Sequence, residues 1–272
     1  MRLEVTEIRD IPGETVKLSI VIPAYNEEAR LGPTLEAICA YLASAGRSHE
    51  IIVVDDGSQD GTAELVRQWQ ASHPVIRLIR NEGNRGKGYS VRCGALAARG
   101  QVVLFADADN STPIEQAEQL VARLEEGYDI AIGSRGLPES DLAVRQPVYR
   151  EQMGKLFGRL MRLLTGLPFR DSQCGFKAFK RDVVQRLFPL LTVDRFAFDT
   201  ELLFVAVKRF GYRVAEVPVR WVNSPDTRLN ALTDSARMLW DLLRVRRQAG
   251  KVRAPASSPP CAEPDAAMGP RG

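Results

Sequence analysis

The sequence predicts an α/β protein built on a doubly wound, mostly parallel sheet. Two observations support this fold class. Short apolar runs of strand length alternate with stretches of helical period through the first half of the 272-residue chain, as in repeated strand, helix, strand units. The composition, with 44% hydrophobic and 26% charged residues, is that of an ordinary globular protein.

The first half is expected to contain five strands and four helices. The strands are the apolar runs 18–22, 51–54, 75–79, 102–105 and 130–132. The helices lie between them, at 27–43, 62–71, 88–98 and 114–126. The second half is more helical, and we interpret it as a lid and acceptor half. Its expected helices are 148–164, 182–190, 199–209 and 229–247.

Composition and charge divide the chain and exclude several classes. We expect an N-terminal arm at 1–16, one domain at 17–250, and a disordered Pro- and Ser-rich tail at 251–272. No run reaches the roughly 18 apolar residues of a spanning helix, and a signal peptide is not evident, so a cytoplasmic location is expected. Four scattered cysteines and two histidines leave carboxylates to supply the chemistry. A net charge of +3 does not favour a nucleic-acid partner.

Two loops at neighbouring strand ends form the first candidate site. Residues 23–28 follow the first strand and residues 55–62 follow the second. Tyr25 offers an aromatic face to a base, and Asp55 offers a carboxylate that accepts hydrogen bonds from ring nitrogen or ribose hydroxyls. A plain helix entry explains either turn alone, but the pairing favours nucleotide binding.

The loop after the third strand, residues 81–88, combines glycines with Arg85 and Lys87 near a helix start. Such a loop suits an anion. Its glycine spacing matches neither a Walker loop nor a dinucleotide fingerprint. A flexible surface turn explains it equally well.

Asp107 and Asp109 follow the fourth strand and form the strongest local feature. Alternation along an extended backbone puts both carboxylates on one side. Two adjacent carboxylates repel each other unless a cation lies between them, and Mg²⁺ or Mn²⁺ prefers such oxygen ligands. The alternative is that one Asp caps the helix that begins at Pro113.

In this order, the motifs resemble family 2 glycosyltransferases of the GT-A fold, and within them the polyprenyl-phosphate sugar synthases, especially the dolichyl-phosphate β-glucosyltransferases. The resemblance extends over roughly residues 17–247, and its later motifs are 133–135, 171–177 and 198–203. It implies that Asp107 and Asp109 hold the metal and diphosphate. It also implies a nucleoside site with Lys87 beside it, formed by Pro23, Tyr25, Glu27, Asp55 and Asp56.

The resemblance implies an inverting transfer of a hexose from a nucleotide-sugar donor to a polyprenyl phosphate. Residues 173–177 favour UDP-glucose over GDP-mannose as the donor. A phosphate monoester, with a second pKa of about 6, is already largely ionised at neutral pH and needs no strong base. Arg135 and Arg150 are the candidates for binding that phosphate. Asp171 is the candidate for orienting or deprotonating the acceptor, with Glu201 behind it.

Two basic amphipathic helices, starting at Val148 and Leu229, pack on the protein's own core or contact the inner face of a membrane peripherally. Two alternatives stay open: a family 2 enzyme acting on a soluble or surface glycan with Asp171 as base, and a nucleotide-sugar binding module without catalysis. Processive synthesis is disfavoured, because Val217 occupies the position of a Gln in the motif that ends in Arg220 and Trp221.

Overall fold

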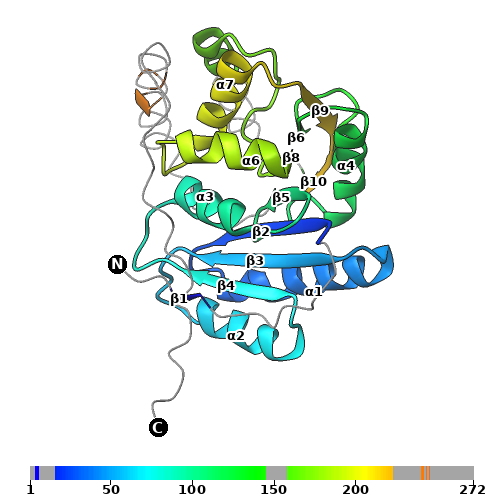
Figure 1. The fold of residues 1–272 in the computed structure, drawn as a ribbon, viewed down its shortest axis with the longest axis vertical. Coiled ribbons are helices and arrows are strands. Elements are labelled where there is room, and N and C mark those ends of the chain that lie inside the picture. The colour runs from blue at the N-terminus through cyan, green and yellow to red at the C-terminus, as the bar shows by residue number, and fades with distance from the viewer. Residues whose placement is uncertain are drawn as a thin grey trace.

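The computed structural model describes residues 4–5, 16–144, 158–222, 240, 241, 243 and 245. Within these residues, one sheet has the strand order β1-β4-β3-β2-β5-β8-β6-β9, and helices cover both of its faces (Figure 1). One core contains side chains of α1, α2 and α4, and the other contains side chains of α3, α6 and α7. The predicted doubly wound α/β fold is confirmed.

Every strand and helix predicted in the first half is present, with ends within two residues of those expected when the short 3₁₀ turn η1 (Ile114–Gln116) is counted with α4. The strands are β2 (Leu18–Ala24), β3 (His49–Asp55), β4 (Ile76–Arg80), β5 (Val102–Ala106) and β6 (Ile130–Ser134). The helices are α1 (Glu28–Ala45), α2 (Thr62–Ser72), α3 (Lys87–Ala97) and α4 (Ala117–Glu125).

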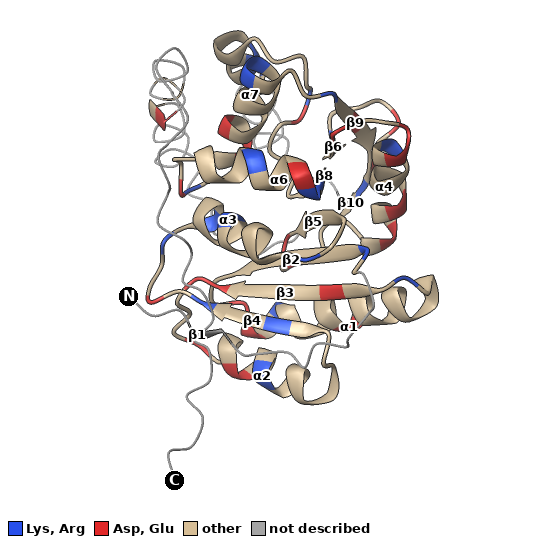
Figure 2. Ribbon diagram, viewed as in Figure 1, with Lys and Arg blue, Asp and Glu red and all other residues tan. Residues whose placement is uncertain are grey.

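Continuous apolar runs form the central strands because both faces of the sheet are covered. In β2, Ile20 and Ile22 pack into the core below α1, whereas Val21 packs into the core below α3. The strands β2, β3, β4 and β5 are mutually parallel. Their carboxyl ends therefore meet at one edge, where the loop after β3 is acidic (Figure 2).

The second half supplies strands as well as the predicted helices. β8 (Phe176–Lys180) is inserted antiparallel between β5 and β6, and β9 (Val214–Pro218) runs parallel to β6. β8 was missed because it is an antiparallel insertion outside the repeated strand, helix, strand units, although Lys177 has the same place in it as Arg77 has in β4. The remaining elements are β7 (Asp141–Val144), α6 (Arg181–Leu187), the 3₁₀ turn η2 (Phe188–Leu190), α7 (Phe198–Phe210) and β10 (Arg220–Val222).

Several predicted segments lie wholly or partly outside the described residues. These are Arg150, the tail at 251–272, the start of the helix at 148–164 and most of the helix at 229–247. Residues 158–165 are helical, as predicted. β1 (Glu4–Val5), within the predicted N-terminal arm, pairs with β4 at the edge of the sheet. Across the part of the chain that is described, we find no helix with the length and apolar character needed to cross a membrane.

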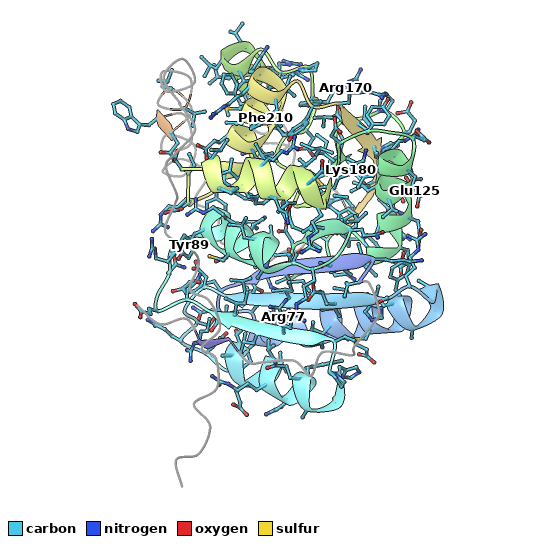
Figure 3. All side chains as sticks on the ribbon, viewed as in Figure 1. Arg77, Tyr89, Glu125, Arg170, Lys180 and Phe210 are labelled. Carbon is cyan, nitrogen blue, oxygen red and sulfur yellow. The ribbon has the colours of Figure 1, made fainter. Side chains whose placement is uncertain are left out.

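A buried polar network lies near the amino ends of the strands, far from the acidic edge. Glu50 on β3 accepts hydrogen bonds from Arg77 Nη1 (2.9 Å), Ser19 Oγ (2.6 Å) and the backbone N–H of Arg99 (2.6 Å). Arg77, on β4 (Figure 3), also donates to the backbone oxygen of Ala97 at the end of α3 (2.9 Å). The network ties three strands to the carboxyl end of α3.

Candidate active site

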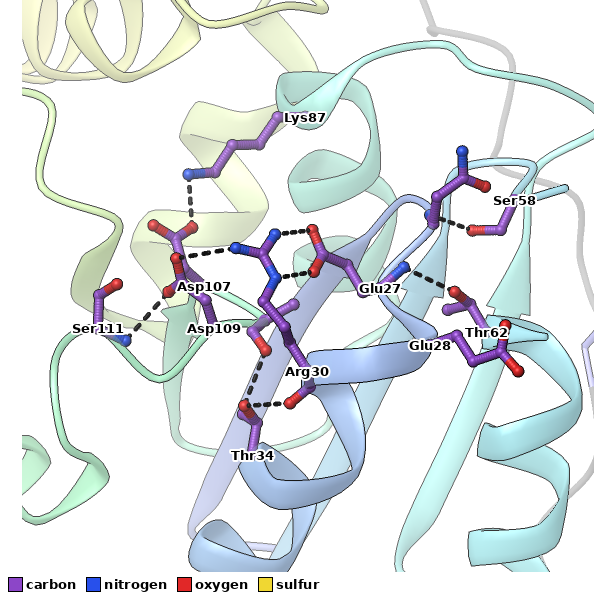
Figure 4. Close-up of polar contacts among 12 residues, drawn as sticks. Glu27, Glu28, Arg30, Thr34, Ser58, Thr62, Lys87, Asp107, Asp109 and Ser111 are labelled. Carbon is purple, nitrogen blue, oxygen red and sulfur yellow. Dashed lines mark hydrogen bonds and ion pairs between the residues drawn. The ribbon is translucent and has the colours of Figure 1, made fainter. Parts of the chain in front are cut away.

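The predicted nucleoside residues lie together at the carboxyl ends of β2 and β3. Pro23 is paired in register with Val54, and Tyr25 follows the last residue of β2. Glu27 precedes α1 and accepts two hydrogen bonds from Arg30, at 2.6 and 2.7 Å (Figure 4). In an open parallel sheet, this edge is where ligands bind.

Asp55, at the end of β3, has a fully buried carboxylate. Its Oδ1 accepts a hydrogen bond from the backbone N–H of Ser58 (2.9 Å). Its Oδ2 lies 3.0 Å from Arg80 Nε in an ion pair, but the two atoms lack the alignment of a hydrogen bond. Its charge is neutralised by Arg80 within the protein, and its predicted contact with a nucleoside stays a prediction.

Asp56 holds the glycine loop that precedes α3. Its carboxylate accepts hydrogen bonds from the backbone N–H groups of Arg85 (2.9 Å) and Gly86 (2.7 Å), and from Asn81 Nδ2 (2.8 Å). Asp56 therefore shapes the loop through protein donors alone, and its predicted contact with a nucleoside stays a prediction.

The glycine loop packs closely against the segment that precedes α7. Gly86 has φ of +109°, and a Cβ there would collide with the backbone oxygen of Asp194. The backbone N–H of Tyr89 donates to the same oxygen (3.0 Å). The positive φ and the close approach of the Asp194 oxygen both require a glycine at position 86. This packing fixes the start of α3, where Lys87 lies.

The carboxylates of Asp107 and Asp109 lie side by side, although the reason given from the sequence is wrong (Figure 4). The backbone is not extended here. β5 ends at Ala106, and the chain turns so that Asn110, with φ of 49°, donates its N–H to the backbone oxygen of Asp107 (3.4 Å). Thr34 of α1 holds the turn by donating to the backbone oxygen of Ala108 (2.8 Å).

Two cations face these carboxylates. Lys87 Nζ lies 2.5 Å from Asp107 Oδ1, and Arg30 Nη1 lies 3.9 Å from Asp109 Oδ2. Burial lowers the pKa of Lys87, but attraction to Asp107 and Asp199 outweighs burial, so the pKa is raised and Lys87 stays charged. Each of the two carboxylates at the predicted metal position thus has a cationic side chain beside it.

The carboxylate pair fits a hard divalent cation. Both side chains are partly exposed, at 34% for Asp107 and 22% for Asp109, so their oxygens are accessible. Among the described residues, no cluster of three or more His, Cys, Asp or Glu side chains could hold a metal. Two protein carboxylates leave the remaining positions to phosphate and water, which suits Mg²⁺ and Mn²⁺.

Arg135, just after β6, forms a bidentate pair with Asp171. Nε donates to Oδ2 (2.6 Å) and Nη2 donates to Oδ1 (3.0 Å), while the Arg135 guanidinium lies 5.5 Å from the Trp221 ring centre. Burial alone would raise the pKa of Asp171, but attraction to Arg135 and its hydrogen bonds lower it to about 2. Asp171 is therefore a weak base. The structure brings these two predicted site residues together, and it shows that they bind each other.

Glu201 contacts the segment that precedes α7. Its carboxylate accepts hydrogen bonds from the backbone N–H groups of Thr192 (3.0 Å) and Val193 (2.8 Å) and from the Thr192 hydroxyl (2.7 Å). Burial raises the pKa of Glu201, although these donors oppose the shift. Glu201 holds the segment before α7, and its predicted role at the acceptor, behind Asp171, stays a prediction.

The sequence analysis missed a buried ion pair beneath the site. Lys177 of β8 is fully buried, and its Nζ lies 2.5 Å from Asp199 Oδ1 and 2.5 Å from the backbone oxygen of Cys174. A lysine inside a run of apolar strand residues was the available signal, because such a lysine requires a buried partner.

Comparison with known proteins places this site in a family. The model of "Glycosyl transferase family 2" matches residues 19–188. A dolichyl-phosphate beta-glucosyltransferase of Dictyostelium discoideum is 36% identical, covering 86% of this chain and 75% of that protein. The protein of the same name from Homo sapiens is 35% identical, covering 85% of this chain and 75% of that protein.

Solved structures agree on the fold. Mannosyl-3-phosphoglycerate synthase from Rubrobacter xylanophilus has a TM-score of 0.64 and 25% identity, covering 90% of this chain and 78% of that chain. Glucosyl-3-phosphoglycerate synthase from Mycobacterium tuberculosis, crystallised with Mn²⁺, UDP and glucosyl-3-phosphoglycerate, has a TM-score of 0.63 and 22% identity, covering 88% of this chain and 81% of that chain. The chain thus has the GT-A fold and belongs to glycosyl transferase family 2, among the relatives of the dolichyl-phosphate β-glucosyltransferases.

Proposed function

We propose that this chain transfers glucose from UDP-glucose, with inversion, to the phosphate of dolichol or a related polyprenol, using Mg²⁺ or Mn²⁺ at Asp107 and Asp109. One observation carries the choice of acceptor. Three carboxylates that could deprotonate a sugar hydroxyl, Asp171, Asp199 and Glu201, are each engaged with protein groups among the described residues. A phosphate acceptor does not need them, because it is already an oxyanion at neutral pH.

The three carboxylates are engaged in different ways. Asp171 is held on both oxygens by Arg135 and has a pKa of about 2. Asp199 is paired with Lys177 at 2.5 Å inside the protein. Glu201 receives its hydrogen bonds from the segment before α7. A general base must offer an available lone pair to the acceptor, and each of these carboxylates is bound by protein groups instead.

Arg135 is the residue we assign to the acceptor phosphate. Its Nε and Nη2 are occupied by Asp171, whereas no described residue accepts a hydrogen bond from its Nη1. Asp171 fixes the orientation of the guanidinium, so Nη1 is available in a defined position. Its place just after β6 is on the same edge of the sheet as Asp107. Arginine is the side chain best suited to binding phosphate in such a fixed geometry.

The donor side follows from the residues at the ends of β2, β3 and β5. Asp55 Oδ2 would accept an N–H of the base, and Tyr25 would offer it an aromatic face. Asp107 and Asp109 would hold the divalent cation, which neutralises charge on the departing diphosphate. Lys87 adds a positive charge beside the same phosphates. The names of the relatives support glucose as the sugar, and the Mn²⁺ and UDP in the mycobacterial structure support the cation and nucleotide.

The helical residues 158–165 support peripheral contact with the inner face of a membrane. Leu163 is 80% exposed and Leu160 is 37% exposed, and Arg159 and Arg162 flank them in sequence. Exposed leucines beside arginines suit a shallow contact with anionic lipid, which salt weakens.

The proposal is tested with purified protein, Mn²⁺ and vesicles that contain dolichyl phosphate, supplied with UDP-glucose, GDP-mannose or UDP-N-acetylglucosamine. We expect a hexosyl phosphate lipid from UDP-glucose in the organic phase by mass spectrometry. We also expect less vesicle-bound protein and less product as the salt concentration rises. Vesicles that contain unphosphorylated dolichol are the control. Product only on soluble sugars would instead support the glycan acceptor, and UDP binding without any product would support a binding module.

A further inference from the structure

The buried pair of Lys177 and Asp199 lies directly beneath the proposed cation site. Lys177 is the second residue of β8, in register with Phe105 of β5 on one side and Ile132 of β6 on the other. Its ammonium makes two short contacts, to Asp199 Oδ1 and to the backbone oxygen of Cys174, each at 2.5 Å. The pair therefore joins the middle of the sheet to the first turn of α7 and to the loop before β8.

The first link from this pair to the site runs through Gly175. Lys177 holds the backbone of Cys174, and the next residue, Gly175, is packed against the carboxylate of Asp107. A Cβ on Gly175 would overlap with all three carboxyl atoms of Asp107. The Asp107 carboxylate thus packs directly against the backbone of Gly175, and Lys177 fixes the position of that backbone.

The second link runs through Lys87. The Asp107 carboxylate contacts Gly175 on one side and the Lys87 ammonium on another. Lys87 and Lys177 both lie over the ring of Phe105, at 5.7 and 5.2 Å from its centre. Asp199 fixes the Lys177 ammonium beside this ring through its ion pair at 2.5 Å. The Phe105 ring, which both ammonium groups approach, therefore links the position of Lys177 to that of Lys87 beside Asp107.

Stability alone does not account for this pair. Removing two charges from water costs several kcal/mol for each ion, and replacing a buried pair with uncharged residues of similar volume is often neutral or stabilising. A fully buried lysine in an internal strand of the sheet is thus a costly way to fill the space. Both of its links lead to the same carboxylate, which indicates a role at the site.

We propose that the Lys177–Asp199 pair is a positioning device that fixes Asp107 for the divalent cation and the donor diphosphate. It acts from below, through the Gly175 backbone and the Lys87 ammonium, and touches neither ligand. This inference rests on the proposed nucleotide and cation site, but not on the proposed acceptor.

The test uses a variant that removes both charges, Lys177→Met with Asp199→Asn, and measures UDP binding in Mn²⁺ by calorimetry together with thermal unfolding. Loss of groups that orient metal ligands typically weakens metal affinity about ten- to hundredfold. We expect a loss of Mn²⁺-dependent UDP affinity of that size with an unfolding temperature close to that of the wild type. Gly175→Ala, which changes no charge, should weaken the same binding.

The matched control is the other buried pair of the sheet, Arg77→Met with Glu50→Gln. This pair joins neighbouring strands at 2.9 Å but lies near the opposite edge, so UDP affinity should be unchanged. Wild-type UDP affinity in the folded Lys177→Met/Asp199→Asn variant would overturn the inference, and so would failure of that variant to fold, since the pair would then serve stability. If the wild type itself bound no UDP in Mn²⁺, the proposed function would fail first.

Discussion

Replacing Asp109 with alanine is expected to lower turnover about 10³-fold, because the loss of a cation ligand removes several kcal/mol of charge stabilisation from the departing diphosphate. The fold should survive. The Asp109 side chain lies in a surface turn, where its Oδ1 accepts one hydrogen bond from the Ser111 N–H at 3.0 Å. Losing such a bond costs about 1 kcal/mol. Steady-state rates with saturating Mn²⁺ and thermal unfolding measure the two effects separately.

Asp141→Ala is the control for this change. Asp141 is an exposed aspartate in a long ion pair with Arg220, at 3.5 Å, so the variant should keep both its rate and its stability. Excess chelator should reduce the wild-type rate to the level of Asp109→Ala. Full turnover in chelator, or an unchanged rate in Asp109→Ala, would remove the cation from the mechanism.

Replacing Arg135 with alanine is expected to lower kcat/KM for the lipid phosphate roughly ten- to hundredfold and to leave UDP binding in Mn²⁺ unchanged. The lost contact is a charge-assisted hydrogen bond to the attacking phosphate, which is worth about 1.5 to 3 kcal/mol. Arg135→Lys should recover only part of the loss, because an ammonium lacks the planar fork that Asp171 orients. Acceptor kinetics and calorimetry provide the two measurements.

Arg170→Ala is the control for the acceptor assignment, since Arg170 is exposed (Figure 3) and its Nη1 donates to the backbone oxygen of Gly136, the residue after Arg135, at 3.5 Å. It should leave acceptor use unchanged. Equal losses of donor and acceptor binding in Arg135→Ala would indicate that the site had collapsed. A wild-type kcat/KM for the lipid phosphate in Arg135→Ala would show that Arg135 does not bind the acceptor.

The first half of the fold could be predicted because its signal is local. Strands such as β2 and β3 are buried on both faces, so they are mainly apolar in sequence, and the polar loops after them mark one edge of the sheet. The strands of the second half depend more on contacts between residues that are far apart in the sequence. β8 is equally buried, but it contains Lys177, whose partner Asp199 lies 22 residues further along the chain. A sequence pattern cannot show that this charge is neutralised.

The site could be predicted at the level of its residues but not of their pairing. The positions of Asp55, Asp107 and Arg135 follow from strand ends, and these were identified. That Arg135 neutralises Asp171, 36 positions away, and that Lys87 neutralises Asp107 depends on how β5, β6 and α3 come together. The ion pair with Arg135, which the sequence does not reveal, makes Asp171 a weak base. The turn at Asp107 likewise depends on the positive φ of Asn110, which residue alternation does not reveal.

The central claim is that the enzyme transfers the sugar to an acceptor that is already ionised, without a protein base. The most direct test is the pH dependence of kcat/KM for a polyprenyl phosphate, compared with that for its phosphonate analogue, whose second ionisation occurs at higher pH. We predict that the rate rises with a midpoint near the second pKa of the phosphate, about 6, and that the midpoint moves upward with the phosphonate. A midpoint that stays at the same pH for both acceptors would assign the ionisation to a protein base and contradict the account.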